Sequence, residues 1–300
     1  MYYIQRNIRT SEEGAAFVRI CEENFRFRLH QLVRSAIYDS LPEVITLSGP
    51  TCSGKTTTAR KLTAEIAGAG KNAMVLSIDD FFHERTSEKL VGNEVDFDTV
   101  AAIDLPLLAD CLGRMLKGEK TDLPHFNFQT GKREASHPYV STPDDIIILE
   151  GIQAVYPEVT ALLSACRCKS IFINVTEDVM VNDVFFSRTD VRLIRRIVRD
   201  YRFRSAIPEF TLDIWKNVRK NEEENIFPYV ADCDFTINSM QPYELFMLAP
   251  FAIPLLESVP DSSIHAQTAC ELLTKLLALS GNEIDPACLA PDSLYHEFLG

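Results

Sequence analysis

From residue 43 onward, short apolar runs alternate with longer segments whose apolar positions recur at helical spacing. The runs are rich in Val, Ile and Leu, which is typical of parallel strands buried on both faces. Alternating strands and helices predict an α/β fold: a parallel sheet flanked by helices. The predicted strands are Val44–Leu47, Ala73–Ile78, Ile146–Leu149, Ser170–Val175 and Asp234–Ile237.

The pattern differs outside these runs. Apolar residues at helical spacing predict a helix within residues 10–40, and two more over Tyr243–Leu256 and Ile264–Leu279. Residues 118–145, with three prolines, are expected to be loop-rich, and residues 177–225 are densely charged and mostly helical.

This organisation predicts a central domain with two additions. We expect the domain over residues 41–240, a helical N-terminal extension over 1–40 and a helical C-terminal extension over 241–300.

Composition and charge narrow the class of protein. Apolar residues make up 46% of the 300 residues, as in a globular protein with a full core. A net charge of −13 disfavours general binding to nucleic acid or to anionic membranes. No apolar run is long enough for a membrane span, the N-terminus lacks the layout of a signal peptide, and the eight cysteines are scattered. We expect a cytoplasmic protein with free thiols, and a homo-oligomer stays possible.

One motif carries the strongest chemical signal. Residues 49–56 fit G-x-x-x-x-G-K-[ST], the phosphate-binding loop of nucleoside triphosphate enzymes, between a predicted strand and a predicted helix. Lys55 is expected to reach the β- and γ-phosphates of ATP, and the Thr56 hydroxyl to hold Mg²⁺. The residues expected to bind ATP are Gly49, Pro50, Thr51, Cys52, Ser53, Gly54, Lys55, Thr56 and Thr57.

Acidic residues stand at the ends of two other predicted strands. Asp79 is a candidate general base or Mg²⁺ ligand, and Asp80 a weaker one. Glu150 is a candidate Mg²⁺ ligand because an acid at the tip of a buried strand is costly unless it is paired or bound to metal. The alternative for each is a helix cap or a turn.

Two further groups of residues are candidates. Four arginines at offsets 0, 3, 4 and 7 share one helical face, which suits phosphate or, alternatively, a solvated face paired with acids: Arg192, Arg195, Arg196 and Arg199. Phe126 and Phe128, and Phe81 and Phe82 beside the aspartates, are expected either to stack on a base or to pack in the core.

Together these pieces resemble the uridine kinase and phosphoribulokinase family over about residues 43–240. The resemblance rests on six motifs in order: Gly49–Thr56, Leu76–Phe82, Asp96–Asp98, Pro124–Phe128, Ile148–Ile152 and Thr189–Asp200. The arginine-rich segment and the C-terminal Pro291–Gly300 look like a branch of uridine-kinase-like proteins that are often fused to other domains.

The resemblance implies a role for individual residues. Asp79 looks like the base for the acceptor 5′-hydroxyl, and Thr56 and Glu150 like Mg²⁺ partners, with Asp79 a possible third. Asp98 and Arg192 look like sugar-binding residues. Phe82, Phe126 and Phe128 lie in motifs where the family places aromatics around the base. Arg196 and Arg199 look like catalytic residues of a lid, about 177–225, that closes over the phosphates.

The implied function is an ATP- and Mg²⁺-dependent kinase that phosphorylates a primary hydroxyl of a nucleoside such as uridine or cytidine. Two positions depart from the family: Gly131 replaces a histidine, and Ile214-Trp215 replaces Gln-Tyr. Both changes remove polar groups near a pyrimidine edge. A sugar, polyol or sugar phosphate acceptor therefore stays open, as does a nucleotide-binding regulatory protein.

Overall fold

The computed structural model describes residues 1–84, 99–128, 130–142 and 144–300. A five-stranded sheet in the order β10-β7-β2-β6-β3 forms its centre, and every neighbouring pair of strands in it is parallel. The strands are β2 (Val44–Ser48), β3 (Ala73–Ser77), β6 (Ile146–Glu150), β7 (Cys168–Asn174) and β10 (Phe235–Asn238). The predicted α/β parallel sheet is therefore confirmed, within a residue or two at the strand ends.

Both faces of this sheet are covered, which explains the unbroken apolar runs. Along β6, Ile146 and Ile148 enter one buried cluster, whereas Ile147 and Leu149 enter another. The first cluster includes α1 (Ser11–Ser40), α2 (Lys55–Gly68) and α5 (Arg188–Arg204), and the second includes α3 (Leu105–Leu116) and α4 (Pro157–Leu162). Successive side chains point to opposite faces of a strand, so a strand buried on both sides must be apolar throughout.

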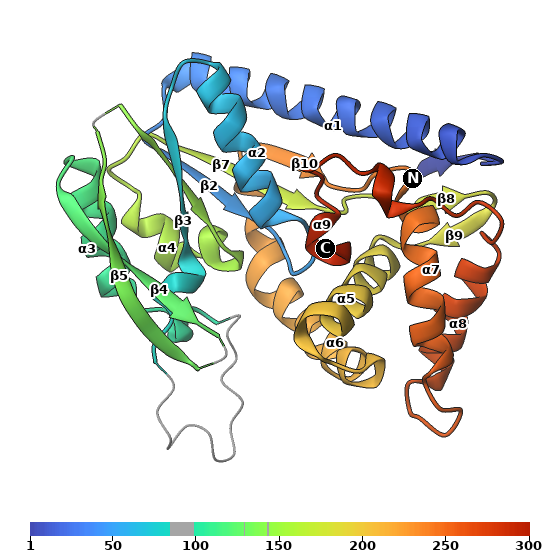
Figure 1. Ribbon diagram of the computed structural model, residues 1–300. Coiled ribbons are helices and arrows are strands. Elements are labelled where there is room, and N and C mark those ends of the chain that lie inside the picture. Colours follow the sequence, from blue (N-terminus) through green and yellow to red (C-terminus); the bar gives the residue numbers. More distant parts are fainter. Residues whose placement is uncertain (85–98, 129, 143) are drawn as a thin grey trace.

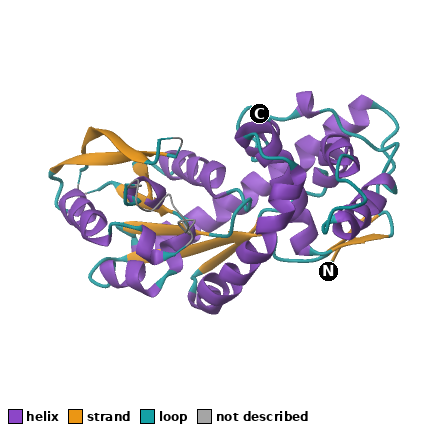
Figure 2. Cartoon of the chain, turned by 90° about the horizontal axis from the view of Figure 1, so that it is seen from below, coloured by secondary structure: helices purple, strands orange, loops and turns teal. Residues whose placement is uncertain are grey.

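The helices predicted outside the sheet region are present, and their apolar faces join the first cluster. Thr10 caps α1 and accepts a hydrogen bond from the Glu13 amide. The C-terminal helices are α7 (Glu244–Glu257), α8 (Ala266–Leu277) and the short α9 (His296–Leu299), and α6 (Pro208–Asn221) follows α5. Figure 1 shows α9 and the C-terminus at the centre of the molecule, close to α2, α5 and α7. In Figure 2 most strands gather in one half of the view and helices fill the other.

Two small sheets consist of strands that the sequence pattern did not predict. Strand β1 (Tyr2–Ile4) pairs in parallel with β8 (Val179–Val181), which pairs with β9 (Val184–Phe186). The loop-rich expectation for residues 118–145 was wrong, because β4 (Lys120–Asn127) and β5 (Lys132–Val140) form an antiparallel hairpin. The ladder shifts register on either side of Pro124, so this proline lies where pairing is irregular.

Across the described ranges, no helix combines the length and the apolar character needed to cross a membrane.

Candidate active site

The register of the sheet brings three predicted motifs to one place. Leu47 of β2 lies opposite Glu150 of β6, and Glu150 lies opposite Ser77 of β3. The phosphate loop follows β2, and Asp79 follows β3 by two residues in a 3₁₀ turn. Since the strands are parallel, the loop, Glu150 and Asp79 lie along the same carboxyl edge, where ligands of open α/β sheets bind.

The phosphate loop has a backbone that requires both of its glycines. A Cβ atom at Gly49 would lie 2.1 Å from the carbonyl oxygen of Ile173, and Gly54 has a φ of +87° directly before α2. The Ser53 hydroxyl is fully buried and has no hydrogen-bond partner among the described residues. A loop at a helix N-terminus with an unsatisfied buried hydroxyl fits a phosphate group.

Lys55 contacts the loop, and its charge acts on the two carboxylates. Its Nζ donates to the Pro50 carbonyl at 3.1 Å, across the loop. Burial raises the pKa of Asp79; the Lys55 charge opposes that rise, the Asp80 charge adds to it and the Arg204 charge opposes it. Burial also raises the pKa of Glu150, to about 7, with Lys55 again lowering it and Asp79 raising it. One cation therefore faces two carboxylates that repel each other.

This arrangement predicts that Glu150→Gln stabilises the metal-free protein at pH 8. A carboxyl whose folded pKa lies above its unfolded value costs stability as the pH rises from about 4.5 to about 7. The amide removes that cost, which is worth at most roughly 3 kcal/mol. Thermal unfolding with a chelator at pH 4.5 and pH 8 checks this. The melting temperature of the variant should exceed wild type at pH 8, with a much smaller difference at pH 4.5; equal differences at both pH values would contradict the assignment.

The same residues fit a magnesium ion. Thr56 lies in the first turn of α2 with an exposed side chain, and the repulsion between Asp79 and Glu150 is what a bound cation would relieve. No three His, Cys, Asp or Glu side chains in the described ranges gather into a metal cage. Mg²⁺ in kinases needs none, because one or two carboxylates, water and substrate phosphates complete its shell.

The four arginines of α5 are buried, so the solvated-face alternative was wrong. Arg192, Arg195, Arg196 and Arg199 are each 8% exposed or less. Arg192 forms a two-pronged ion pair with Glu222 and also donates to the Thr51 carbonyl at 3.2 Å. Its sugar-binding role stays a prediction; the contacts in the structure are with the loop and with Glu222.

The other arginines also contact the loop or a shared acid. Arg195 pairs with Glu244 and donates to the Cys52 carbonyl at 3.0 Å. Arg196 and Arg199 both pair with Asp200, and Arg199 reaches the Thr51 hydroxyl at 3.5 Å. Three guanidinium groups of α5, those of Arg192, Arg195 and Arg199, thus donate hydrogen bonds to the phosphate loop.

The predicted aromatic residues form a cluster at the hairpin. Phe82, Phe126 and Phe128 contact one another edge to face, with ring centroids 5.2–5.9 Å apart. Phe82 and Phe126 are buried, whereas Phe128 is 48% exposed. Asp80 fixes this arrangement, because its Oδ1 accepts from the Phe126 amide at 3.1 Å and lies 3.0 Å from Nδ1 of His125. Asp80 therefore positions the hairpin, and Asp79 is the carboxylate beside Lys55.

Asp98, predicted to bind the sugar, lies outside the described residues. Sequence reasoning missed the acids that pair with the arginines, Glu222 and Glu244, and it missed Tyr295, which donates to Glu244. No spacing rule links residues so far apart in the chain. The only sequence signal for Tyr295 is its place in the segment Pro291–Gly300.

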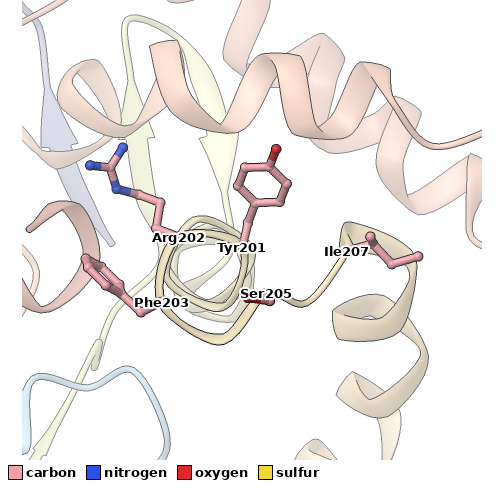
Figure 3. A pocket seen from close by; sticks show the side chains of 5 residues that line it. All are labelled: Tyr201, Arg202, Phe203, Ser205 and Ile207. Carbon is pink, nitrogen blue, oxygen red and sulfur yellow. The ribbon is translucent and has the colours of Figure 1, made fainter.

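A cavity of about 570 Å³ opens where α5 ends and α6 begins. Tyr201, Arg202 and Phe203 project from the last turns of α5, and Ser205 and Ile207 complete its lining (Figure 3). None of these residues belongs to the predicted site. The groups able to bind phosphate and to move a proton gather instead at the edge of the sheet.

The comparison with protein families decides what this site belongs to. Residues 44–245 match the model of the phosphoribulokinase / uridine kinase family, about two thirds of the chain. The chain belongs to this family. It is a phosphotransferase with a hydroxyl acceptor, as the resemblance of its motifs indicated.

Curated proteins similar to this chain belong to the same kind of kinase. The chain is 31% identical over 169 residues to a uridine kinase of Deinococcus deserti, with 56% of this chain and 73% of that protein covered. It is 30% identical over 200 residues to uridine kinase-like protein 5 of Arabidopsis thaliana, with 65% of this chain and 39% of that protein covered. A uridine kinase of Saccharomyces cerevisiae is 29% identical, with 66% and 37% covered. The chain thus spans less than half the length of these two eukaryotic relatives.

A solved structure supports the fold. A candidate fructose transport system kinase from Silicibacter sp. TM1040 superposes with a TM-score of 0.54 at 18% identity, covering 70% of this chain and 98% of that one. At this identity the likeness is evidence of a shared fold only.

Proposed function

We propose that this family member transfers the γ-phosphoryl group of ATP to a primary hydroxyl of a nucleoside, with uridine and cytidine as the first candidates. We also propose that it works in the cytoplasm and needs Mg²⁺. One observation carries the proposal: the sheet register brings the phosphate loop, Glu150 and Asp79 to one edge, where the Lys55 charge acts on both carboxylates. Phosphoryl transfer needs this combination of a cationic phosphate site, an acid for the cation and a separate base.

Each residue has a defined part in the proposed reaction. Asp79 accepts the proton of the acceptor hydroxyl. The hydroxyl oxygen attacks the γ-phosphorus at the same time, and ADP leaves. Lys55 offsets the charge that builds on the transferring group, and Thr56 and Glu150 hold the cation. When bound, Mg²⁺ neutralises charge on the β- and γ-phosphate oxygens.

Arg196 and Arg199 are proposed to act late, as groups that reach the phosphates when the α5–α6 region closes. Their shared partner Asp200 supports this assignment, because it holds both guanidinium groups together, and that of Arg199 already reaches the Thr51 hydroxyl of the loop. Planar guanidinium groups match phosphate oxygens with two hydrogen bonds each, which makes arginine suited to this task.

The cluster of Phe82, Phe126 and Phe128 supports a nucleoside as the acceptor, because aromatic rings can stack on a base. The half-exposed ring of Phe128 offers a face on which a base can stack. Stacking accepts any base, and the histidine that uridine kinases use is replaced by Gly131. Gly131 lies in the hairpin turn at a φ of +66°, a conformation that suits glycine.

This geometry predicts a permissive enzyme. The values of kcat/KM for uridine, cytidine and purine nucleosides should differ by no more than about 10- to 200-fold, because apolar contacts with aromatic rings discriminate only weakly. Ribose and polyols should be poorer acceptors because they lack a base. The measurement is ADP release with each acceptor at fixed ATP.

Three outcomes would contradict this prediction. A preference for uridine of a thousandfold or more would mean that polar groups outside the cluster of Phe82, Phe126 and Phe128 read the base. A sugar or polyol that exceeds every nucleoside would transfer the assignment to the alternative acceptor class, and no acceleration by any acceptor would favour a regulatory nucleotide-binding protein.

A further inference from the structure

The C-terminal segment, residues 291–300, packs against the phosphate loop. Its side chains Leu294, Tyr295 and Phe298 are each no more than 1% exposed. In Figure 1 this segment, with α9, lies between α2 and α5 at the centre of the molecule. These side chains therefore belong to the first buried cluster, together with α2 and α5.

One contact of the segment is made directly on the loop. The Leu294 side chain covers Gly54, so closely that a Cβ at Gly54 would lie 2.3 Å from Leu294 Cδ1. An ion pair of 2.6 Å between Asp292 and Lys61 joins the same segment to α2 two turns further on. The segment therefore rests on the start of the helix that carries Lys55 and Thr56.

A second contact reaches the loop through a buried arginine. Arg195 donates from Nη1 to the Cys52 carbonyl at 3.0 Å and from Nη2 to the Tyr295 hydroxyl at 3.2 Å. The same hydroxyl accepts from the Gln241 amide at 3.2 Å and donates to Glu244, the acid that pairs with Arg195. The Phe298 ring lies 5.4 Å from the Arg195 guanidinium carbon. Tyr295 thus holds the Arg195 guanidinium in place, and Arg195 in turn holds the loop at the Cys52 carbonyl.

We propose that residues 291–300 are a positioning element of the ATP site, which holds the phosphate loop in its binding form through Tyr295, Arg195 and Leu294. Part of this inference rests on the proposed function, since it takes the loop to bind ATP. Tyr295 touches no substrate and acts through Arg195. A buried hydrogen bond to a charged group is costly to lose, and here the loss would loosen the loop backbone at Cys52.

The test compares Tyr295→Phe with a matched control, Tyr243→Phe. Tyr243 is also fully buried and its ring lies 5.2 Å from that of Tyr295. Its hydroxyl donates to Glu22, which also accepts from Ser293, so this control disturbs the same segment without removing a hydrogen bond to Arg195. Both variants should lose some thermal stability. Only Tyr295→Phe should weaken ATP binding, by about tenfold, with the KM of the acceptor unchanged. Only Tyr295→Phe should speed hydrogen exchange at the amides of residues 51–56.

The outcomes separate this inference from the proposed function. Wild type that binds no ATP would overturn the proposed function, while the exchange rates would still decide whether the segment holds the loop. Equal exchange and equal ATP affinity in the two folded variants would overturn the inference alone. If Tyr295→Phe does not fold, Leu294→Val gives the same comparison at Gly54, and unchanged loop exchange in that variant would also overturn it.

Discussion

Replacing Lys55 with alanine is expected to lower turnover by at least about 10²–10³-fold while the protein stays folded. In the proposed reaction, Lys55 carries the charge that offsets the transferring phosphoryl group, and its charge also lowers the pKa of Asp79 and Glu150. Its loss removes stabilisation of the transition state and also raises the pKa of both acids further. Single-turnover phosphoryl transfer at saturating ATP and acceptor measures the effect.

The matched control is Lys71→Ala. Lys71 lies just beyond the far end of α2, so it tests for a general effect of removing a lysine near this helix. This variant should retain wild-type rates. Turnover close to wild type in a folded Lys55→Ala protein would remove Lys55 from the mechanism.

Replacing Asp79 with asparagine should lower kcat by about 10²–10⁴-fold with little change in ATP affinity. The amide keeps the size of the side chain but cannot accept the proton of the attacking hydroxyl. The pH profile gives a second readout. Since burial raises the pKa of Asp79, the acid limb of kcat in wild type should lie above the ordinary aspartate range, and it should vanish in the variant.

Asp80→Asn is the control for this assignment. Asp80 accepts hydrogen bonds from the hairpin that carries Phe126, so its amide variant should alter acceptor binding more than the chemical step. If Asp80→Asn removes most of kcat and Asp79→Asn is mild, the base has been assigned one residue too early.

The sheet and the phosphate loop could be predicted from the sequence because both leave local signals. A strand buried on both faces needs an unbroken apolar run, as in Ile146–Leu149, and the loop needs glycine where Gly49 meets the Ile173 carbonyl. Parallel strands also predict that the residues after each strand, Glu150 among them, gather at one edge, whereas the pairing of Glu150 with Ser77 comes from the structure. A few neighbouring residues are enough to indicate each buried strand and the phosphate loop.

What the sequence did not provide is the set of long-range partners. The spacing of the α5 arginines is the same for a solvent-exposed face and for a buried one. Arg196 and Arg199 pair with the local Asp200, but the partners of Arg192 and Arg195 are Glu222 and Glu244, far along the chain. The hairpin of residues 120–140 was missed for a related reason, since Pro124 and Pro138 lower the strand signal although the ladder accommodates both. Tertiary pairing, which no local pattern encodes, settled both cases.

The most direct test of the central claim is to follow the γ-phosphoryl group itself. ATP, Mg²⁺ and uridine are incubated with wild type, and ³¹P NMR identifies where the phosphorus goes. The proposed function predicts a phosphate monoester on the 5′-hydroxyl of uridine, formed in step with ADP, and its near-absence with Asp79→Asn. Inorganic phosphate as the only product, at a rate that uridine and the other acceptors leave unchanged, would contradict it.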